Sequence, residues 1–157
     1  MSVPGVTTVG IVGAGTMGVG IAQVALEAGH RVAITDRDPT ALLSVVERVR
    51  SGLTRRAARS GETDPWVARV HGRLETRPSV EAAVADADLV IEAAIEDLEA
   101  KQALFRAIAA SAPADALLAT NTSALSVTAI ASATGRPERI LGLHCFNPPP
   151  VLRLVEV

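Results

Sequence analysis

The sequence predicts an α/β fold of the doubly wound type, in which helices cover both faces of a mostly parallel sheet. Short apolar runs alternate along the chain with longer segments of helical periodicity, and this alternation implies crossover connections between parallel strands. A glycine-rich turn at 13–18 joins the first apolar run to the first helical segment. The chain has 157 residues, of which 48% are hydrophobic, so it can bury the core of one domain.

In the first half of the chain, apolar runs predict strands and periodic stretches predict helices. The predicted elements are strands at 6–12, 31–35 and 74–76 and helices at 16–28, 39–59 and 66–69. The apolar residues of the first helix recur on one stripe, and Gly29 is placed to end that helix. Pro39 suits the first turn of the second helix. We expect a helical excursion at about 39–70 within one domain that spans 1–157.

The second half of the chain continues the alternation of strands and helices. Its predicted elements are strands at 87–92, 116–120, 140–146 and 151–157 and helices at 98–110 and 127–133. Polar residues lie at or just beyond the carboxyl ends of four predicted strands, in the segments at Asp36, 92–96, 121–123 and 144–147. The carboxyl ends of parallel strands share one edge, and ligands bind in the crevice outside that edge. These polar residues are therefore predicted to form a site.

Composition argues against several classes of function. The chain has 15 Lys and Arg against 17 Asp and Glu, a net charge of −2, so nucleic-acid binding driven by overall charge is not expected. It has no apolar run long enough to span a membrane and no visible secretory signal, so we expect a soluble cytoplasmic domain. Cys145 is the single cysteine. It cannot form an internal disulfide or fill a multi-thiolate metal site, and no metal is expected.

Positive charge is concentrated between Glu47 and Arg73. This segment holds seven arginines and three acidic residues, a local charge of +4. Two interpretations stay open at this point. The segment is either a solvated helix face, as charge runs usually are, or a landing site for a polyanionic ligand.

The glycine-rich turn has the spacing of a dinucleotide-binding loop. Its six residues are Gly13, Ala14, Gly15, Thr16, Met17 and Gly18. The first glycine permits a tight turn, the second lets the backbone approach a pyrophosphate, and the third allows close packing of strand and helix. Asp36 lies 23 residues after Gly13, where it can accept hydrogen bonds from ribose hydroxyls and repel a 2′-phosphate. NAD is therefore favoured over NADP, although Arg37 leaves some tolerance of NADP open.

Five segments of the chain follow a pattern known from one enzyme family. They are Gly13–Ala22, Ile91–Glu96, Asn121–Leu125, Gly142–Pro148 and the closing Leu154–Val157. In residues, order and spacing they resemble the L-3-hydroxyacyl-CoA dehydrogenases, and the resemblance covers essentially the whole chain. It implies a Rossmann-type fold with NAD as cofactor. The implied activity is oxidation of an L-3-hydroxyacyl-CoA to the 3-ketoacyl-CoA by hydride transfer to NAD.

The resemblance implies that His144 is the catalytic base and that Glu156 is its carboxylate partner. Oxidation of a secondary alcohol releases a proton, which a histidine can accept near neutral pH. A carboxylate on the other ring nitrogen would fix the tautomer and stabilise the imidazolium. Ser123 resembles the catalytic serine that hydrogen-bonds the substrate oxygen and lies near the nicotinamide. From the residues alone, the segment could instead supply a helix N-cap, from Ser123 or Ser126.

Other positions resemble cofactor and substrate contacts of the family. Glu96, Lys101 and Asn147 match positions that contact the cofactor. Asn121 is expected to face the substrate, and Arg59 falls where the family carries a basic contact to CoA. Lys101 is the only lysine in the chain, and an ordinary place on a helix face is the alternative for it.

The family's C-terminal helical domain, which forms the dimer interface and closes over the acyl chain, is absent here. The chain stops at Val157, so we expect a fragment or a stand-alone remnant that binds NAD but is only weakly active on acyl-CoA. Two alternatives stay open. A related β-hydroxyacid dehydrogenase would use a lysine base, for which Lys101 comes too early in the chain. A catalytically idle NAD-binding module would show no dependence on His144.

Overall fold

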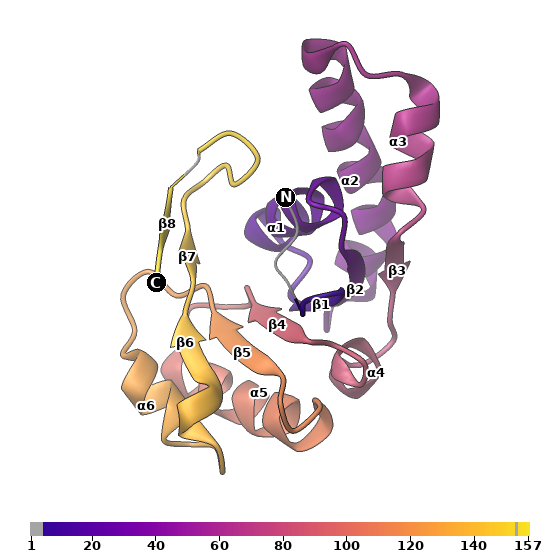
Figure 1. Cartoon of the computed structure of the whole chain (residues 1–157). Helices are drawn as coiled ribbons and strands as arrows, with labels where there is room; N and C mark the ends of the chain where they lie inside the picture. Colours follow the sequence, from indigo (N-terminus) through magenta and orange to yellow (C-terminus); the bar gives the residue numbers. More distant parts are fainter. Residues whose placement is uncertain (1–4, 153) are drawn as a thin grey trace.

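The computed structural model of the chain describes residues 5–152 and 154–157. Six strands form one parallel sheet in the order β3-β2-β1-β4-β5-β6 (Figure 1), which confirms the predicted α/β fold. These strands are β1 (Thr8–Val12), β2 (Arg31–Thr35), β3 (Leu74–Thr76), β4 (Leu89–Glu92), β5 (Leu117–Thr120) and β6 (Ile140–Gly142). In the part of the chain that the structure describes, no helix is long and apolar enough to cross a membrane.

The strand order places a switch point between β1 and β4. From β1 the chain moves outward to β2 and β3, then crosses to β4 and moves outward in the other direction to β5 and β6. The connections after β1 and β4 therefore diverge and open a crevice at the carboxyl edge, where doubly wound sheets bind their ligands. The glycine-rich turn follows β1, and Glu92 ends β4, so both motifs lie at this crevice.

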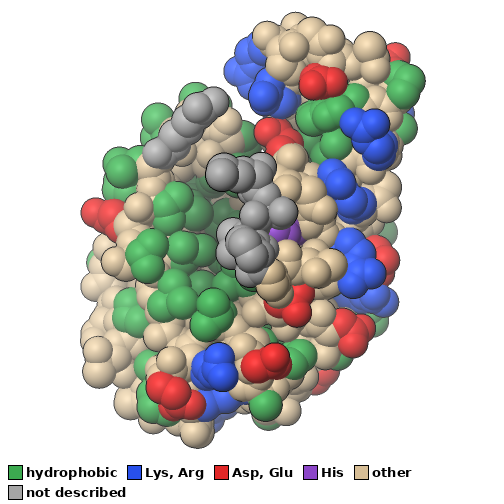
Figure 2. Space-filling view, viewed as in Figure 1, with side chains coloured by type: hydrophobic (Ala, Val, Ile, Leu, Met, Phe, Trp, Pro, Cys, Tyr) green, Lys and Arg blue, Asp and Glu red, His purple; other side chains and the backbone are tan. Residues whose placement is uncertain are grey.

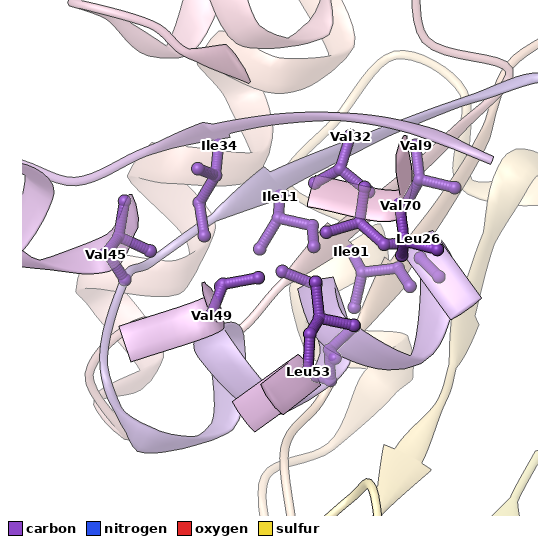
Figure 3. Packing of buried hydrophobic residues seen from close by; sticks show 14 of the residues in the cluster. Val9, Ile11, Leu26, Val32, Ile34, Val45, Val49, Leu53, Val70 and Ile91 are labelled. Carbon is purple, nitrogen blue, oxygen red and sulfur yellow. The ribbon is translucent and has the colours of Figure 1, made fainter. Parts of the chain in front are cut away.

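Two apolar clusters attach the helices to the two faces of the sheet. The helices are α1 (Thr16–Glu27), α2 (Pro39–Ser60), α3 (Asp64–His71), α4 (Val80–Val84), α5 (Leu98–Ser111) and α6 (Val127–Ala131), with a short 3-10 helix at Pro137–Arg139. One cluster joins α1, α2 and α3 to the sheet and includes Ile11, Leu26 and Leu53 (Figure 3). The other cluster includes Phe105 of α5 and Leu118 of β5. Helices therefore cover both faces, as the alternating pattern predicts.

Helices α2 and α3 pack against each other and project beyond the sheet (Figure 1). Helix α2 begins after Asp38, whose side chain accepts a hydrogen bond from the Thr40 N–H at 2.8 Å, and Pro39 lies in its first turn. It ends at Gly61, whose φ of 74° lies in the left-handed region that favours glycine. The arginine-rich segment of the sequence thus lies on this projecting pair.

The predicted strand at 140–146 is divided into two strands that belong to different sheets. Strand β6 ends at Gly142, and the last backbone hydrogen bond to β5 runs from the Leu143 N–H to the Thr120 carbonyl, at 2.9 Å. The chain then leaves the parallel sheet and forms β7 (His144–Cys145), which pairs with β8 (Val155–Glu156) in an antiparallel ribbon. An apolar run shows no boundary at this point, because both halves are apolar.

Two further elements differ from the sequence prediction. Only β8 is a strand within the predicted 151–157 segment, of which residue 153 lies outside the described residues. Helix α4 has no counterpart in the prediction. It is five residues long, too short to reveal a helical period, and it begins after Ser79, whose hydroxyl accepts a hydrogen bond from the Ala82 N–H at 3.2 Å.

Candidate active site

The glycine-rich turn is shaped so that side chains are excluded from it. Gly13 has a φ of 113°, and a Cβ added to Gly13 would lie 2.5 Å from the Ala93 carbonyl oxygen. A Cβ on Gly18 would lie 1.8 Å from the Gly13 carbonyl oxygen. Gly13 and Gly18 therefore let β1, the turn after β4 and α1 approach one another closely.

Gly15 has a different role from the other two glycines of the turn. A Cβ on Gly15 would meet no atom within 4 Å, so the glycine leaves open space rather than avoiding a clash. Gly15 is also the N-cap of α1 and supplies no side-chain cap to the helix. The first N–H groups of α1 therefore point toward this space, and a phosphate at the positive end of the helix would satisfy them.

Asp36 directly follows β2 and lies beside this turn. Its Oδ2 accepts a hydrogen bond from the Ala14 N–H at 2.6 Å, and its Oδ1 accepts one from the Asp38 N–H at 2.8 Å. A cavity of about 540 Å³ lies against it and is also lined by Arg37, Ile95 and Leu104, a volume within the range of small-molecule sites. A carboxylate at the end of this cavity, next to an open helix N-terminus, fits the adenosine half of NAD.

Three polar side chains form a hydrogen-bonded row at the same edge of the sheet. Ser123 Oγ lies 3.0 Å from His144 Nε2, and His144 Nδ1 lies 2.8 Å from Glu156 Oε2. The ribbon explains the second contact, because His144 and Glu156 are directly opposed between β7 and β8. The side chain of His144 is 21% exposed and that of Glu156 is 67% exposed, so the row is open to a substrate. The centroid of the Phe146 ring lies 4.5 Å from that of the His144 imidazole.

The row is able to move a proton. A carboxylate beside Nδ1 favours the tautomer that carries its proton there, so Nε2 is the acceptor nitrogen: it accepts from the Ser123 hydroxyl here and can accept a proton from a bound alcohol. The Ser123 hydroxyl can donate a hydrogen bond to the oxygen of that alcohol. Cys145, next to His144, is a free thiol whose pKa is raised by burial, so it is a poor nucleophile near neutral pH.

Lys101 is buried in an ion pair with Glu92. The Lys101 side chain is 1% exposed and that of Glu92 is fully buried. Lys101 Nζ donates to both carboxylate oxygens of Glu92, at 2.7 and 2.9 Å. The same carboxylate accepts hydrogen bonds from the Thr120 hydroxyl and the Ala94 N–H, each at 2.7 Å. Each oxygen of Glu92 therefore has two donors, as a buried charge requires.

Glu96 connects this ion pair to the serine of the row. Its Oε2 lies 3.3 Å from Lys101 Nζ, and its Oε1 accepts hydrogen bonds from the Thr122 hydroxyl and the Ser123 N–H. Burial works to raise the pKa of Glu96, but these two hydrogen bonds and the Lys101 charge hold its pKa below the usual value. The sequence suggests Lys101 and Glu96 as cofactor contacts but does not reveal the pair with Glu92. The one signal for it is a single lysine placed nine residues after a strand-end acid.

The remaining predicted residues make different contacts, and Arg59 lies apart from this edge. The Asn121 side-chain oxygen accepts a hydrogen bond from the Cys145 N–H at 2.8 Å and so joins the end of β5 to β7. Asn147 is exposed, and its peptide bond to Pro148 is cis. Arg59 is exposed in the last turn of α2. Among residues 5–152 and 154–157, no group of three or more His, Cys, Asp and Glu side chains could hold a metal ion.

A groove of about 340 Å³ separates α1 from α2, and we call it the α1–α2 groove. Thr16 and Asn147 line it on the side of the candidate active site. Arg48 and Arg55 of α2 line it on the other side. Two members of the arginine-rich segment thus face a concave surface next to the glycine-rich turn, and periodicity alone does not separate them from their neighbours.

Comparison with known proteins places this geometry in context. Residues 8–157 match the sequence model of a family described as "3-hydroxyacyl-CoA dehydrogenase, NAD binding domain". The chain is 47% identical over 152 residues to a 3-hydroxyadipyl-CoA dehydrogenase of Escherichia coli (strain K12), which covers 97% of this chain and 32% of that protein. It is 41% identical over 147 residues to a probable 3-hydroxybutyryl-CoA dehydrogenase of Bacillus subtilis (strain 168), covering 94% of this chain and 51% of that protein.

A solved structure agrees with these sequence matches. The crystal structure of a 3-hydroxybutyryl-CoA dehydrogenase from Escherichia coli K12 superposes with a TM-score of 0.89 at 46% identity, over 96% of this chain and 32% of the other. The chain therefore spans between about a third and about half of the length of these relatives. The remaining residues of these relatives are not aligned with this chain.

Proposed function

Because the chain belongs to the family of 3-hydroxyacyl-CoA dehydrogenase NAD-binding domains, with NAD as its cofactor, we propose that it also carries the catalytic base of such an enzyme. The substrate pair would be an L-3-hydroxyacyl-CoA and the corresponding 3-ketoacyl-CoA. The observation that carries the proposal is the row from Ser123 through His144 to Glu156. This row lies at the same edge of the sheet as the glycine-rich turn.

In the proposed reaction the 3-hydroxyl group of the substrate lies against Ser123 and His144. NAD held at the glycine-rich turn would supply the acceptor for the hydride that leaves C3 of the substrate. His144 Nε2 accepts the hydroxyl proton, so that the oxygen becomes a carbonyl as the hydride leaves. Glu156 stabilises the imidazolium that results, and the Ser123 hydroxyl donates a hydrogen bond to the carbonyl oxygen. In the reverse direction the same imidazolium returns the proton.

The C-terminal domain expected from the resemblance would cover the apolar side of the ribbon. Several apolar side chains there are between 42% and 56% exposed: Val24, Val151, Leu152, Leu154 and Val155. Figure 2 shows hydrophobic side chains gathered over the part of the molecule that holds β7 and β8. An exposed patch of this kind marks an interaction site. We propose that a helical domain covers it in a complete enzyme and provides the dimer interface.

Turnover of acetoacetyl-CoA with NADH tests the proposal. The 157-residue chain should bind NADH and oxidise it slowly, because the helical domain proposed to cover the apolar patch lies outside these residues. His144→Gln should abolish the slow oxidation and leave NADH binding unchanged. His71→Gln, which changes a histidine of α3, is the matched control. An unchanged rate in His144→Gln, with normal NADH binding, would favour a catalytically idle module.

A further inference from the structure

Arg48 of α2 makes a direct contact with the glycine-rich turn. Its Nη1 donates a hydrogen bond of 2.8 Å to the carbonyl oxygen of Ala14. The two residues are 34 positions apart in the sequence, so the contact fixes α2 against the turn that follows β1. No feature of the sequence distinguishes Arg48 from the other arginines of α2.

The contact places a positive charge beside the space that Gly15 leaves open. Ala14 immediately precedes Gly15, the N-cap of α1, and Arg48 shares the lining of the α1–α2 groove with Thr16, the first residue of that helix. The first turn of α1 contains no acidic residue. A guanidinium held here through Nη1 keeps its other N–H groups for a second acceptor.

Other charged groups near this edge are engaged differently. Lys101 is buried between Glu92 and Glu96. Arg37 lies beside Asp36, against the 540 Å³ cavity rather than in the groove. Glu47 also lines the groove, and its Oε1 accepts a hydrogen bond from the Ser51 hydroxyl. Among the described residues that line the groove, the cationic ones are Arg48 and Arg55, and together with Glu47 they carry a charge of +1.

We propose that Arg48 binds the pyrophosphate of the dinucleotide cofactor. The proposal rests on NAD binding at the glycine-rich turn and adds a residue to it. The end of a helix carries about half a positive charge, whereas a pyrophosphate bridge carries two negative charges. An arginine fork adds a full charge and directed N–H donors, which suit phosphate oxygens. The hydrogen bond to Ala14 holds the guanidinium at the correct end of α1.

Coenzyme A also contains a pyrophosphate and is the competing occupant. Arg48 is assigned to the cofactor because it donates a hydrogen bond to the cofactor-binding turn itself. Arg55 lies two helical turns further along α2, away from that turn, and lines the same groove without such an anchor. CoA would therefore depend on Arg55 and its neighbours more than on Arg48.

The test compares ligands that contain and lack the pyrophosphate. Dissociation constants of adenosine, ADP, NAD and CoA are measured at low and high salt for the wild-type chain, Arg48→Ala and Arg48→Lys. Arg50→Ala removes an exposed arginine from the same helix and is the matched control. Arg48→Ala should weaken ADP and NAD about tenfold at low salt, as expected for a partly exposed charge-assisted bond. It should leave adenosine unchanged, and Arg48→Lys should recover part of the loss.

Each other outcome overturns the proposal. An equal loss for adenosine and ADP would mean that Arg48 only shapes the turn. A loss confined to CoA would assign the arginine to the substrate. No loss in Arg48→Ala, or a loss as large in Arg50→Ala, would remove any specific role. If the wild-type chain and all variants fail to bind NAD, the premise that the glycine-rich turn binds NAD is wrong. This result differs from a loss of affinity in the Arg48 variants alone.

Discussion

His144 and Glu156 are directly opposed across the β7–β8 ribbon, and their side chains meet at 2.8 Å. The register of two short strands thus sets the distance between the imidazole and its carboxylate. The other ring nitrogen of His144 faces Ser123, which comes from the loop after β5. The row from Ser123 to Glu156 therefore combines a loop of the six-stranded sheet with the β7–β8 ribbon.

Glu156→Gln should lower turnover of acetoacetyl-CoA without lowering NADH affinity. The amide is neutral, so it no longer stabilises the imidazolium and no longer selects one tautomer. Because Glu156 is largely exposed, the loss should be about ten- to a hundredfold, below the effect of a buried triad carboxylate. Steady-state kinetics and fluorescence titration of NADH would measure the two effects. Glu138→Gln, at an exposed acid in the 3-10 helix, should change neither, and a similar loss there would contradict the interpretation.

Two alanine substitutions in the glycine-rich turn should have different effects: one should destabilise the fold and the other should weaken NAD binding. Gly18→Ala places a Cβ 1.8 Å from a backbone oxygen, so it should destabilise the fold by several kcal/mol, roughly the scale of overpacking with backbone displacement. Gly15→Ala points its methyl into open space, so the free energy of unfolding should hold while NAD affinity falls at least about tenfold. Urea denaturation and calorimetric titration would separate them. Full NAD affinity in Gly15→Ala would disprove the phosphate site.

Lys101→Met should destabilise the fold by about 3–5 kcal/mol, because it leaves the buried Glu92 carboxylate without its counter-ion. Arg106→Met removes an exposed cation from the same helix and is the control. The double variant Lys101→Met with Glu92→Gln should recover part of the loss, since the remaining buried group is neutral. Urea denaturation measures all three. A loss in Lys101→Met no larger than that in Arg106→Met would show that the ion pair contributes little.

The carboxylate of Asp88 should make stability depend on pH in the acid range. Its Oδ2 accepts hydrogen bonds from the Thr8 and Thr7 N–H groups, and these bonds hold the pKa of Asp88 below its usual value. The stabilisation is thus complete above the unfolded-state pKa of about 3.9 and is lost as the pH falls through the lower folded-state pKa. Asp88→Asn should cost about 1 kcal/mol at pH 7.

Comparison of Asp88→Asn with the wild type at acid pH serves as the control. As the wild-type carboxyl becomes protonated, the difference in free energy of unfolding between wild type and Asp88→Asn should shrink toward zero. Thermal unfolding followed by circular dichroism from pH 7 downward would measure that difference. A difference that stays constant with pH would assign the effect to packing rather than to charge.

The positions of the glycine-rich turn and of the acid after β2 could be predicted from the sequence because they depend on local patterns. The glycine spacing after β1 and the acid after β2 are each set by one strand and the turn that follows it, and residues near in sequence carry the whole signal. The parallel sheet is predictable for the same reason, since each crossover joins consecutive elements. These features require no knowledge of long-range contacts.

The parts that could not be predicted depend on long-range contacts. The end of β6 depends on how Asn121 and Cys145 meet, 24 residues apart. The ion pair of Lys101 depends on a helix packing against the end of another strand. The contact of Arg48 with Ala14 depends on the angle between α2 and the turn. The pairing of His144 with Glu156 is implied only by the family resemblance, because a two-residue strand carries no period.

The β7–β8 ribbon gives the molecule two parts of unequal rigidity. A pair of two-residue strands is a marginal structure by itself, and the Asn121 side chain ties it to the six-stranded sheet. Amide hydrogens of the ribbon should therefore exchange with solvent faster than those of β1 and β4. Substitutions in the ribbon should therefore alter the proposed proton transfer while the glycine-rich turn keeps its shape.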